Sequence, residues 1–258
     1  MTSATFKLGL AAMLAAAAAP AMSFAQGRLT AEGTEFVLLM ADGRALRSAE
    51  LVGATLRVSA RGRAIDVTIR SVEDDRDAVG GRVVLHHLVV KDQGGKPVDL
   101  CAPDAQGRSR GFPVPDGRGG FDLTCTSGAI GKCIRWGYRP WEEQAGGPPL
   151  RDLHQTCVYM TRADYGGDGS TATREGTIVF VCDRFGVRRC DVEAPLAFEA
   201  AWGVAGAICV ARPRIPELVS LAQLAVRYPR LETRLGPACS EESARRDPAA
   251  LLFNRSAE

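Results

Sequence analysis

The cysteines constrain the fold of this chain more than any other feature of its sequence. A structural zinc site would need closely spaced pairs such as C-x2-C, and the sequence has none. An even number of cysteines in an exported chain indicates disulfides, but eight cysteines allow roughly a hundred pairings, so the connectivity stays open. The eight are Cys101, Cys125, Cys133, Cys157, Cys182, Cys190, Cys209 and Cys239.

Residues 1–25 have the pattern of a secretory signal peptide. Lys7 gives a positive charge, residues 8–19 form an apolar run, and Ser23 and Ala25 provide small side chains at the −3 and −1 positions of a cleavage site. The run is too short to cross a bilayer, which takes about 20 residues. No cysteine follows it before Cys101, which argues against an acylated lipoprotein. We therefore predict export to the periplasm or the cell exterior, with no membrane span after cleavage.

The mature chain divides by its cysteines into a β-rich region, residues 26–94, and a disulfide-rich domain, residues 95–256. Residues 102–120 are rich in Gly, Pro, Arg and Asp and predict a long loop. We expect an α+β fold that is β-rich, has two or three short helices and is cross-linked by disulfides. Strands are predicted at 34–40, 51–58, 63–72, 82–92, 121–125, 176–183 and 207–212. Helices are predicted at 150–162, 195–203 and 216–228.

The charge of the chain is nearly balanced, at +2, and most of its basic residues are arginine. No basic cluster is dense enough to indicate a nucleic-acid partner. We interpret the arginines as solvated surface charges.

The stretch MTRADYGGDGSTATREG, residues 160–176, has the spacing of a calcium-binding loop. Asp164, Asp168 and Glu175 would supply the carboxylates. Gly166 stands where a further ligand is expected, and a strand rather than a helix is predicted to follow. The alternative, which we favour, is a glycine-rich turn in which the aspartates accept hydrogen bonds from nearby backbone amides.

An aromatic and arginine-rich segment lies at residues 135–141. Such side chains could form a binding surface for an envelope carbohydrate or protein. They could equally fill a core, which we favour because aromatic residues make up only 6% of the chain. The candidate residues are Trp136, Tyr138, Trp141, Arg135 and Arg139.

No set of residues has the pattern of a known catalytic site. His154 precedes Cys157 by one helical turn, which suggests a Cys–His pair, but a cysteine in a disulfide has no thiolate. The adjacent residues His86 and His87 point to opposite faces of a strand and make a poor metal pair. We therefore assign no catalytic residue.

Several peptides together resemble the ADYC domain family of exported bacterial proteins, which is named for an Ala-Asp-Tyr-Cys motif. The resemblance covers roughly residues 95–256 and implies no known activity, substrate or catalytic residue. The peptides are AIGKCIRWGYRPW (129–141), HQTC (154–157), RADYGGDG (162–169), FEAAWG (198–203) and LLFNRS (251–256).

The chain departs from this family motif at one position, since Gly166 replaces the motif cysteine. Because the cysteine count is still even, we infer that a second family cysteine is also missing, and we place it at Tyr228. Cys182 and Cys190 would then form an additional local pair across a strand–turn–strand.

The sequence favours a non-enzymatic binding or structural module of the bacterial envelope or exterior. Two alternatives stay open. One is a hydrolase or other extracytoplasmic enzyme with an unrecognised site. The other is a calcium-dependent module that uses the loop from Asp164 to Glu175; no other cofactor is expected.

Overall fold

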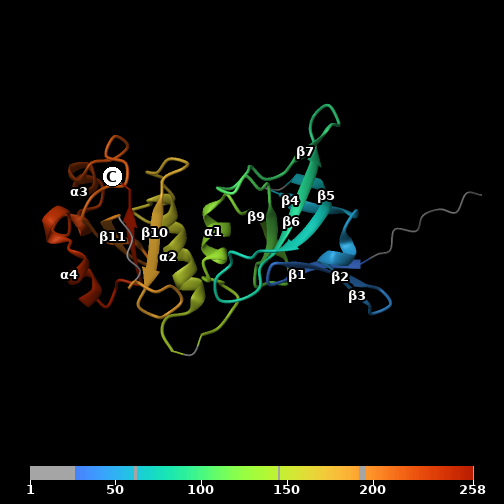
Figure 1. The fold of residues 1–258 in the computed structure, drawn as a ribbon, viewed down its shortest axis with the longest axis horizontal. Coiled ribbons are helices and arrows are strands. Elements are labelled where there is room, and N and C mark those ends of the chain that lie inside the picture. Colours follow the sequence, from blue (N-terminus) through green and yellow to red (C-terminus); the bar gives the residue numbers. More distant parts are fainter. Residues whose placement is uncertain (1–26, 61–62, 145, 192–195, 258) are drawn as a thin grey trace, which may run out of the picture.

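The computed structural model describes residues 27–60, 63–144, 146–191 and 196–257, and within them it contains three antiparallel sheets and four α-helices (Figure 1). The predicted α+β class, rich in strands and cross-linked by disulfides, is confirmed. The predicted signal peptide, residues 1–25, lies outside the described residues. The strands are β1 (Gly27–Glu32), β2 (Glu35–Met40), β3 (Ala45–Arg47), β4 (Thr55–Ala60), β5 (Arg63–Asp74), β6 (Val84–Lys91), β7 (Pro97–Asp99), β8 (Gly111–Pro115), β9 (Phe121–Cys125), β10 (Val179–Asp183), β11 (Ala197–Gly203), β12 (Gly206–Val210) and β13 (Leu252–Ser256). The helices are α1 (Ala129–Arg135), α2 (Leu150–Arg162), α3 (Leu221–Arg227) and α4 (Glu241–Arg246), with 3-10 turns η1 (Ser48–Leu51), η2 (Pro229–Leu231) and η3 (Gly236–Ala238).

Two sheets form the N-terminal half of the molecule. One has the strand order β1-β2-β3, and the other has the order β4-β5-β6-β8-β9 with β7 also paired to β6. Their shared core contains Phe36 of β2, Ile69 of β5 and Leu88 of β6, each no more than 1% exposed. The larger sheet contains strands on both sides of residue 94, so the cysteine-free region and the start of the cysteine-rich region share one sheet.

The C-terminal half packs α2 against a third sheet of order β10-β13-β11-β12. Leu153, Cys157 and Met160 of α2 recur at helical spacing and face Trp202 of β11 in a buried cluster. The helix ends at Ala163, whose left-handed backbone (φ 51°) caps it. The bounds of α2 are those predicted from the sequence.

Helix α1 lies between the two halves (Figure 1). Cys133 on this helix is bonded to Cys157 of α2. Ile134, the next residue, is buried against Val83, Leu85 and Phe112 of the N-terminal half. One short helix therefore contributes to the cores on both of its sides.

The structure corrects several predicted elements. Residues 195–203, predicted as a helix, contain β11, a central strand whose two faces are both buried and which therefore lacks a polar–apolar alternation. Residues 102–120 contain β8 as well as loop. The helix predicted from 216 begins only at Leu221, where Ser220 forms a capping box with Gln223. Helices α1 and α4 and strands β1, β3, β7 and β13 were not predicted.

All eight cysteines are paired in four disulfides. One disulfide closes the segment that runs from just after β7 to the end of β9 in the large sheet. A second joins α1 to α2. The other two lie in the C-terminal sheet and its loops. Cys182 is bonded to Cys190, the pair inferred from the family comparison of the sequence. The other pairs are Cys101–Cys125, Cys133–Cys157 and Cys209–Cys239.

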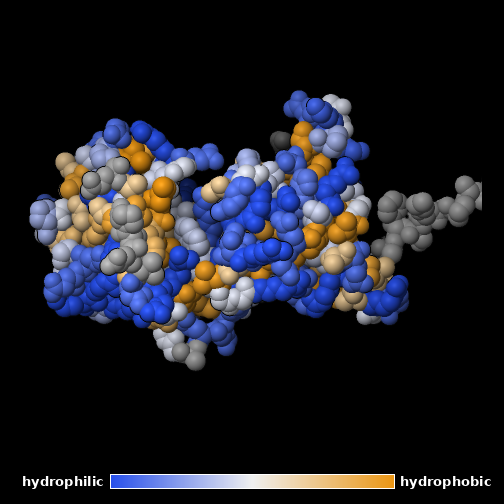
Figure 2. Space-filling view, viewed as in Figure 1, coloured by the Kyte–Doolittle hydropathy of each residue, from blue (hydrophilic) through white to orange (hydrophobic). Residues whose placement is uncertain are grey.

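Hydrophilic residues cover most of the face seen in Figure 2, and its apolar residues form separate patches. In the described part of the chain, every helix falls short of the length and apolarity that a membrane crossing requires.

Candidate functional site

The loop after α2 is organised by the carboxylate of Asp164. This side chain is 1% exposed, and its two oxygens accept N–H hydrogen bonds from Gly167 (2.9 Å), Asp168 (3.2 Å) and Gly169 (2.8 Å). Gly167 and Gly169 have positive φ angles of 71° and 88°. Asp164 therefore forms the centre of a glycine-rich turn, with its oxygens already bound by protein donors.

The other two carboxylates of the predicted calcium loop do not join Asp164. Asp168 accepts hydrogen bonds from Ser170, Arg227 and Tyr228. The Ser170 hydroxyl, with Tyr228 and the Arg227 charge adding to it, holds the pKa of Asp168 well below its ordinary value. Glu175 is exposed. Within the described ranges, no three His, Cys, Asp or Glu side chains are grouped so as to hold a metal ion.

We expect calcium and a chelator to give the same melting temperature. Calcium prefers six to eight oxygen ligands, whereas the Asp164 oxygens are bound by backbone amides and Asp168 is paired with Arg227. The measurement is thermal unfolding of the oxidised protein, with Asp168→Ala as the comparison variant. A calcium-dependent rise that disappears in Asp168→Ala would show that the loop binds the ion.

Tyr165 of the same loop belongs to a buried polar network that was not predicted. Its hydroxyl donates to Glu199 Oε1 (3.1 Å) and accepts the backbone N–H of Arg214 (2.8 Å). Its ring stacks on Trp202 with a centroid distance of 5.2 Å. Burial, with the nearby charge of Glu199, raises the pKa of Tyr165 far above its ordinary value, so the hydroxyl stays protonated.

Glu199 and Arg214 form the charged part of this network. Their side chains are both 0% exposed, and Arg214 donates to both carboxylate oxygens (2.9 and 3.1 Å). Arg214 also donates to the carbonyl oxygens of Met160 and Thr161 at the end of α2. The one sequence signal for this pair is a lone carboxylate within the otherwise apolar strand FEAAWG. The network fixes the motif loop to the sheet and leaves its charges without access to a ligand.

Tyr228 occupies the space beside Gly166, the position at which this chain lacks the motif cysteine. A Cβ atom on Gly166 would lie 2.2 Å from Tyr228 Cε1, far inside van der Waals contact. A side chain at position 166 and the Tyr228 ring therefore exclude each other. This proximity supports the inference that the two positions were exchanged together.

Gly166→Cys alone is expected to lower the free energy of unfolding by about 1–3 kcal/mol, because the new side chain overlaps the Tyr228 ring. The double variant Gly166→Cys, Tyr228→Cys is expected to form a fifth disulfide. Mass spectrometry after alkylation in denaturant measures free thiols. The single variant should show one alkylated thiol and the double variant none; two alkylated thiols in the double variant would contradict the prediction.

The aromatic and arginine-rich segment forms the junction between the two halves and not an open surface. Tyr138 is 0% exposed and donates to Asp183 Oδ2 (2.9 Å). Arg135 pairs with buried Asp75 across the junction. Arg139 is 2% exposed and donates to the carbonyl oxygens of Val79, Gly80 and Gly81. Trp136 and Trp141 are partly buried.

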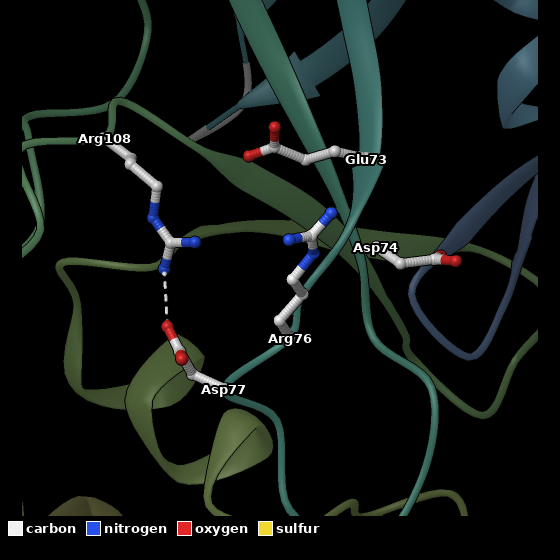
Figure 3. Close-up of a pocket in the computed structure, with 5 residues that line it drawn as sticks. All are labelled: Glu73, Asp74, Arg76, Asp77 and Arg108. Atoms are coloured by element: carbon white, nitrogen blue, oxygen red, sulfur yellow. Dashed lines mark ion pairs between the residues drawn. The ribbon is translucent and has the colours of Figure 1, made fainter.

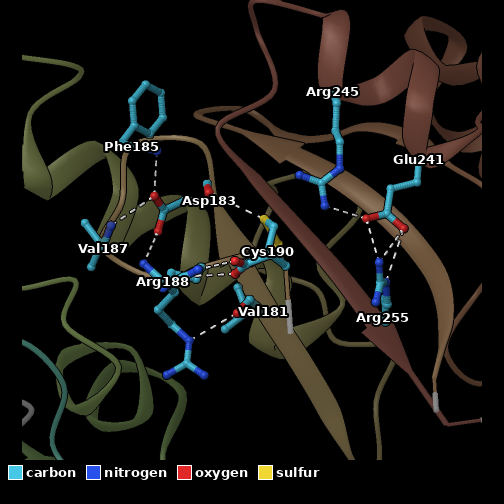
Figure 4. The surroundings of a disulfide bond; sticks show 12 residues. Val181, Asp183, Phe185, Val187, Arg188, Cys190, Glu241, Arg245 and Arg255 are labelled. Atoms are coloured by element: carbon cyan, nitrogen blue, oxygen red, sulfur yellow. Dashed lines mark hydrogen bonds and ion pairs between the residues drawn. A yellow bond between two sulfur atoms is a disulfide. The ribbon is translucent and has the colours of Figure 1, made fainter. Parts of the chain in front are cut away.

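Asp183, the partner of Tyr138, organises the loop that the Cys182–Cys190 disulfide closes (Figure 4). Its carboxylate accepts backbone N–H hydrogen bonds from Phe185 (2.7 Å), Val187 (3.2 Å) and Arg188 (2.7 Å). Asp164 and Asp183 thus play the same structural part in two different loops.

The histidines occupy structural positions. The Cys–His arrangement suggested by the sequence has no nucleophile, since Cys157 is bonded to Cys133. His154 is partly buried, with its Nε2 atom enclosed and without a hydrogen-bond partner among the described residues. His86 is 0% exposed and lies 2.7 Å from Ser48 Oγ. Burial lowers the pKa of His86 and of His154 to about 4.

A polar pocket of about 600 Å³ opens where strand β5 leaves the large sheet (Figure 3). It was not predicted, since the acidic stretch EDDRD resembles an ordinary solvated loop. Charged side chains of both signs line it, and they come from the end of β5, from the loop after it and from the loop before β8. The lining residues are Glu73, Asp74, Arg76, Asp77 and Arg108.

Arg108, one of the lining residues, belongs to a cluster of ion pairs in which Asp75 and Asp104 are buried and Asp77 is exposed. Arg108 Nη2 lies 3.7 Å from Asp75, 3.6 Å from Asp77 and 3.4 Å from Asp104. Arg135 of α1 pairs with Asp75 and Asp104 from the other side. The cluster therefore connects the pocket to the junction of the two halves.

Comparison with known proteins identifies the family. The ADYC domain model matches residues 48–216, well over half of the chain. The match begins before residue 95 and ends before residue 256, the limits expected from the sequence peptides. No curated protein and no solved structure matches the chain. With its motif loop, Ala163 to Gly166, at the end of α2 and inside the matched segment, the chain belongs to the ADYC domain family.

Proposed function

We propose that this chain is exported and acts outside the cytoplasm as a non-enzymatic, disulfide-stabilised module that binds an envelope component. The observation that carries the proposal is the pairing of all eight cysteines in four disulfides. Disulfides persist in oxidising compartments and are rare in the cytosol. The signal-peptide pattern of residues 1–25 also supports this location.

The chemistry of the described residues favours binding over catalysis. The cysteine next to a histidine is oxidised, and the buried Glu199–Arg214 pair is closed to solvent. In the motif loop, the buried Asp164 carboxylate accepts hydrogen bonds from backbone amides. The polar pocket, by contrast, is open to solvent, and its charged groups suit recognition.

Fractionation of cells that express the full chain tests the location. We expect the protein in the periplasm or the medium, shortened at its N-terminus and without free thiols after denaturing alkylation. A matched variant with Leu14→Arg in the apolar run should stay in the cytoplasm with reduced cysteines. Recovery of the unaltered chain in the cytoplasm, with free thiols, would contradict export.

Co-sedimentation with isolated envelope material tests the binding role. We expect the oxidised protein to sediment with the envelope fraction and to leave the soluble fraction chemically unchanged over time. Release of soluble fragments that increases with time would instead indicate a hydrolase. Protein that stays in the supernatant would contradict envelope binding.

A further inference from the structure

Among the described residues, one charged side chain that lines the polar pocket has no ion-pair partner. Glu73 pairs with Arg110 (3.0 Å), Asp74 pairs with Arg82 (2.8 Å) and Asp77 pairs with Arg108 (3.6 Å). Arg76 has no ion pair within the described residues, although four of the five lining side chains do.

The guanidinium groups of Arg76 and Arg108 point toward each other across the pocket (Figure 3). Two like charges that face each other repel. An anion between them would attract both guanidinium groups and offset this repulsion. Guanidinium groups bind carboxylates with two parallel hydrogen bonds, which adds geometric specificity. The space between Arg76 and Arg108 is therefore suited to a carboxylate.

Arg108 and its neighbour Asp104 also carry unsatisfied polar atoms. Arg108 Nε and Nη2 and Asp104 Oδ2 are buried and have no hydrogen-bond partner among the described residues. The nearest carboxylate oxygens are 3.4–3.7 Å from Arg108 Nη2, too far for a normal hydrogen bond. Leaving buried donors and acceptors unpaired costs free energy, so a ligand that draws Arg108 into better contacts is favoured.

The carboxylates around the pocket restrict the ligand further. Glu73, Asp74 and Asp77 would repel a multiply charged anion such as phosphate, but the same groups attract an ammonium group. The pocket volume of about 600 Å³ lies within the range for small-molecule sites. We propose that the pocket binds a small zwitterion, a free amino acid or a short peptide, with its carboxylate between Arg76 and Arg108 and its ammonium toward Glu73 or Asp77.

This proposal rests on the proposed binding role and names its ligand class. Calorimetric titration of the oxidised protein with the common amino acids and with diglycine tests it. N-acetylated diglycine lacks the ammonium charge, and C-terminally amidated diglycine lacks the carboxylate charge. We expect binding of at least one zwitterion, weakened about tenfold or more when either charge is blocked. If free amino acids bind and diglycine does not, the ligand is a free amino acid. If diglycine binds and free amino acids do not, the ligand is a short peptide.

Arg76→Gln removes the unpaired charge at an exposed position, and Arg70→Gln is its control, because Arg70 is an exposed residue of the same strand β5 outside the pocket. Zwitterion affinity should fall about tenfold or more in Arg76→Gln and stay unchanged in Arg70→Gln. Equal affinity in both variants, or no binding by any amino acid or diglycine, would overturn the assignment. If envelope co-sedimentation persists in that case, only the ligand class and pocket are wrong; if it is lost as well, the binding role fails with them.

Discussion

Replacing Glu199 with alanine is expected to lower the free energy of unfolding by about 3–5 kcal/mol, because it leaves a buried guanidinium without its counter-charge. Arg214 and Glu199 are both 0% exposed, so solvent cannot replace the lost carboxylate. Arg214 also holds the last carbonyl groups of α2, next to the motif loop. The loss should therefore extend to the loop that Tyr165 anchors.

Denaturant unfolding of the oxidised protein measures this effect. Glu242→Ala is the matched control, since Glu242 forms an exposed pair with Arg246 on α4, and its removal should cost no more than about 0.5 kcal/mol. The double variant Glu199→Ala, Arg214→Met should recover part of the loss, because it removes the uncompensated charge. Equal losses in Glu199→Ala and Glu242→Ala would show that the buried network does not contribute as described.

Acid is expected to destabilise the protein between pH 6.5 and about 4 through the buried His86 and the partly buried His154. Burial lowers the pKa of His86 and of His154 to about 4, whereas an unfolded histidine titrates near 6.5. Below pH 6.5 the unfolded chain therefore binds protons that the folded chain does not. The contribution of the two neutral histidines to the free energy of unfolding is fully present above pH 6.5. It is lost as the pH falls toward 4, by up to about 3 kcal/mol per histidine.

Unfolding free energies at a series of pH values test this prediction. His154→Leu should flatten the dependence of the unfolding free energy on pH, because it removes one of the two titrating rings. The substitution breaks no hydrogen bond of the ring Nε2 atom, which has no partner among the described residues. Gln93→Leu is the control, because Gln93 is exposed and carries no titratable group. Asp168, whose pKa is held low, loses its contribution only at still lower pH. Identical pH profiles for the wild type and His154→Leu would contradict the assignment to His154.

Arginine has a different role here from the one its sequence context suggested. The sequence predicted solvated surface charges, whereas several arginines donate to backbone carbonyl groups of loops and helix ends. Arg230 alone donates to the carbonyl oxygens of Tyr165, Gly166, Ala205 and Ala207. The planar guanidinium has five N–H donors in a fixed geometry, whereas a lysine ammonium has three on a flexible stem. Composition reports the number of arginines but not the carbonyl groups that surround them.

The sequence by itself determined the features that depend on local patterns. Helical spacing gave the bounds of α2, β-branched runs gave β5 and β6, and the even cysteine count indicated disulfides. The glycines and aspartates of the motif loop predicted hydrogen bonds from backbone amides to an aspartate, and Asp164 accepts them.

Tertiary structure decided what depends on contacts between distant residues. Strand β11 was predicted as a helix because a central strand, buried on both faces, carries no alternating pattern. The aromatic and arginine-rich segment lies at the junction of the two halves because its side chains have partners in both. Arg135 pairs with Asp75 in one half, and Tyr138 donates to Asp183 in the other. The pocket likewise combines the end of β5 with Arg108 from a later loop. Local sequence preferences act over a few residues, whereas the partners of Arg135, Tyr138 and Arg108 are chosen by the packing of the whole chain.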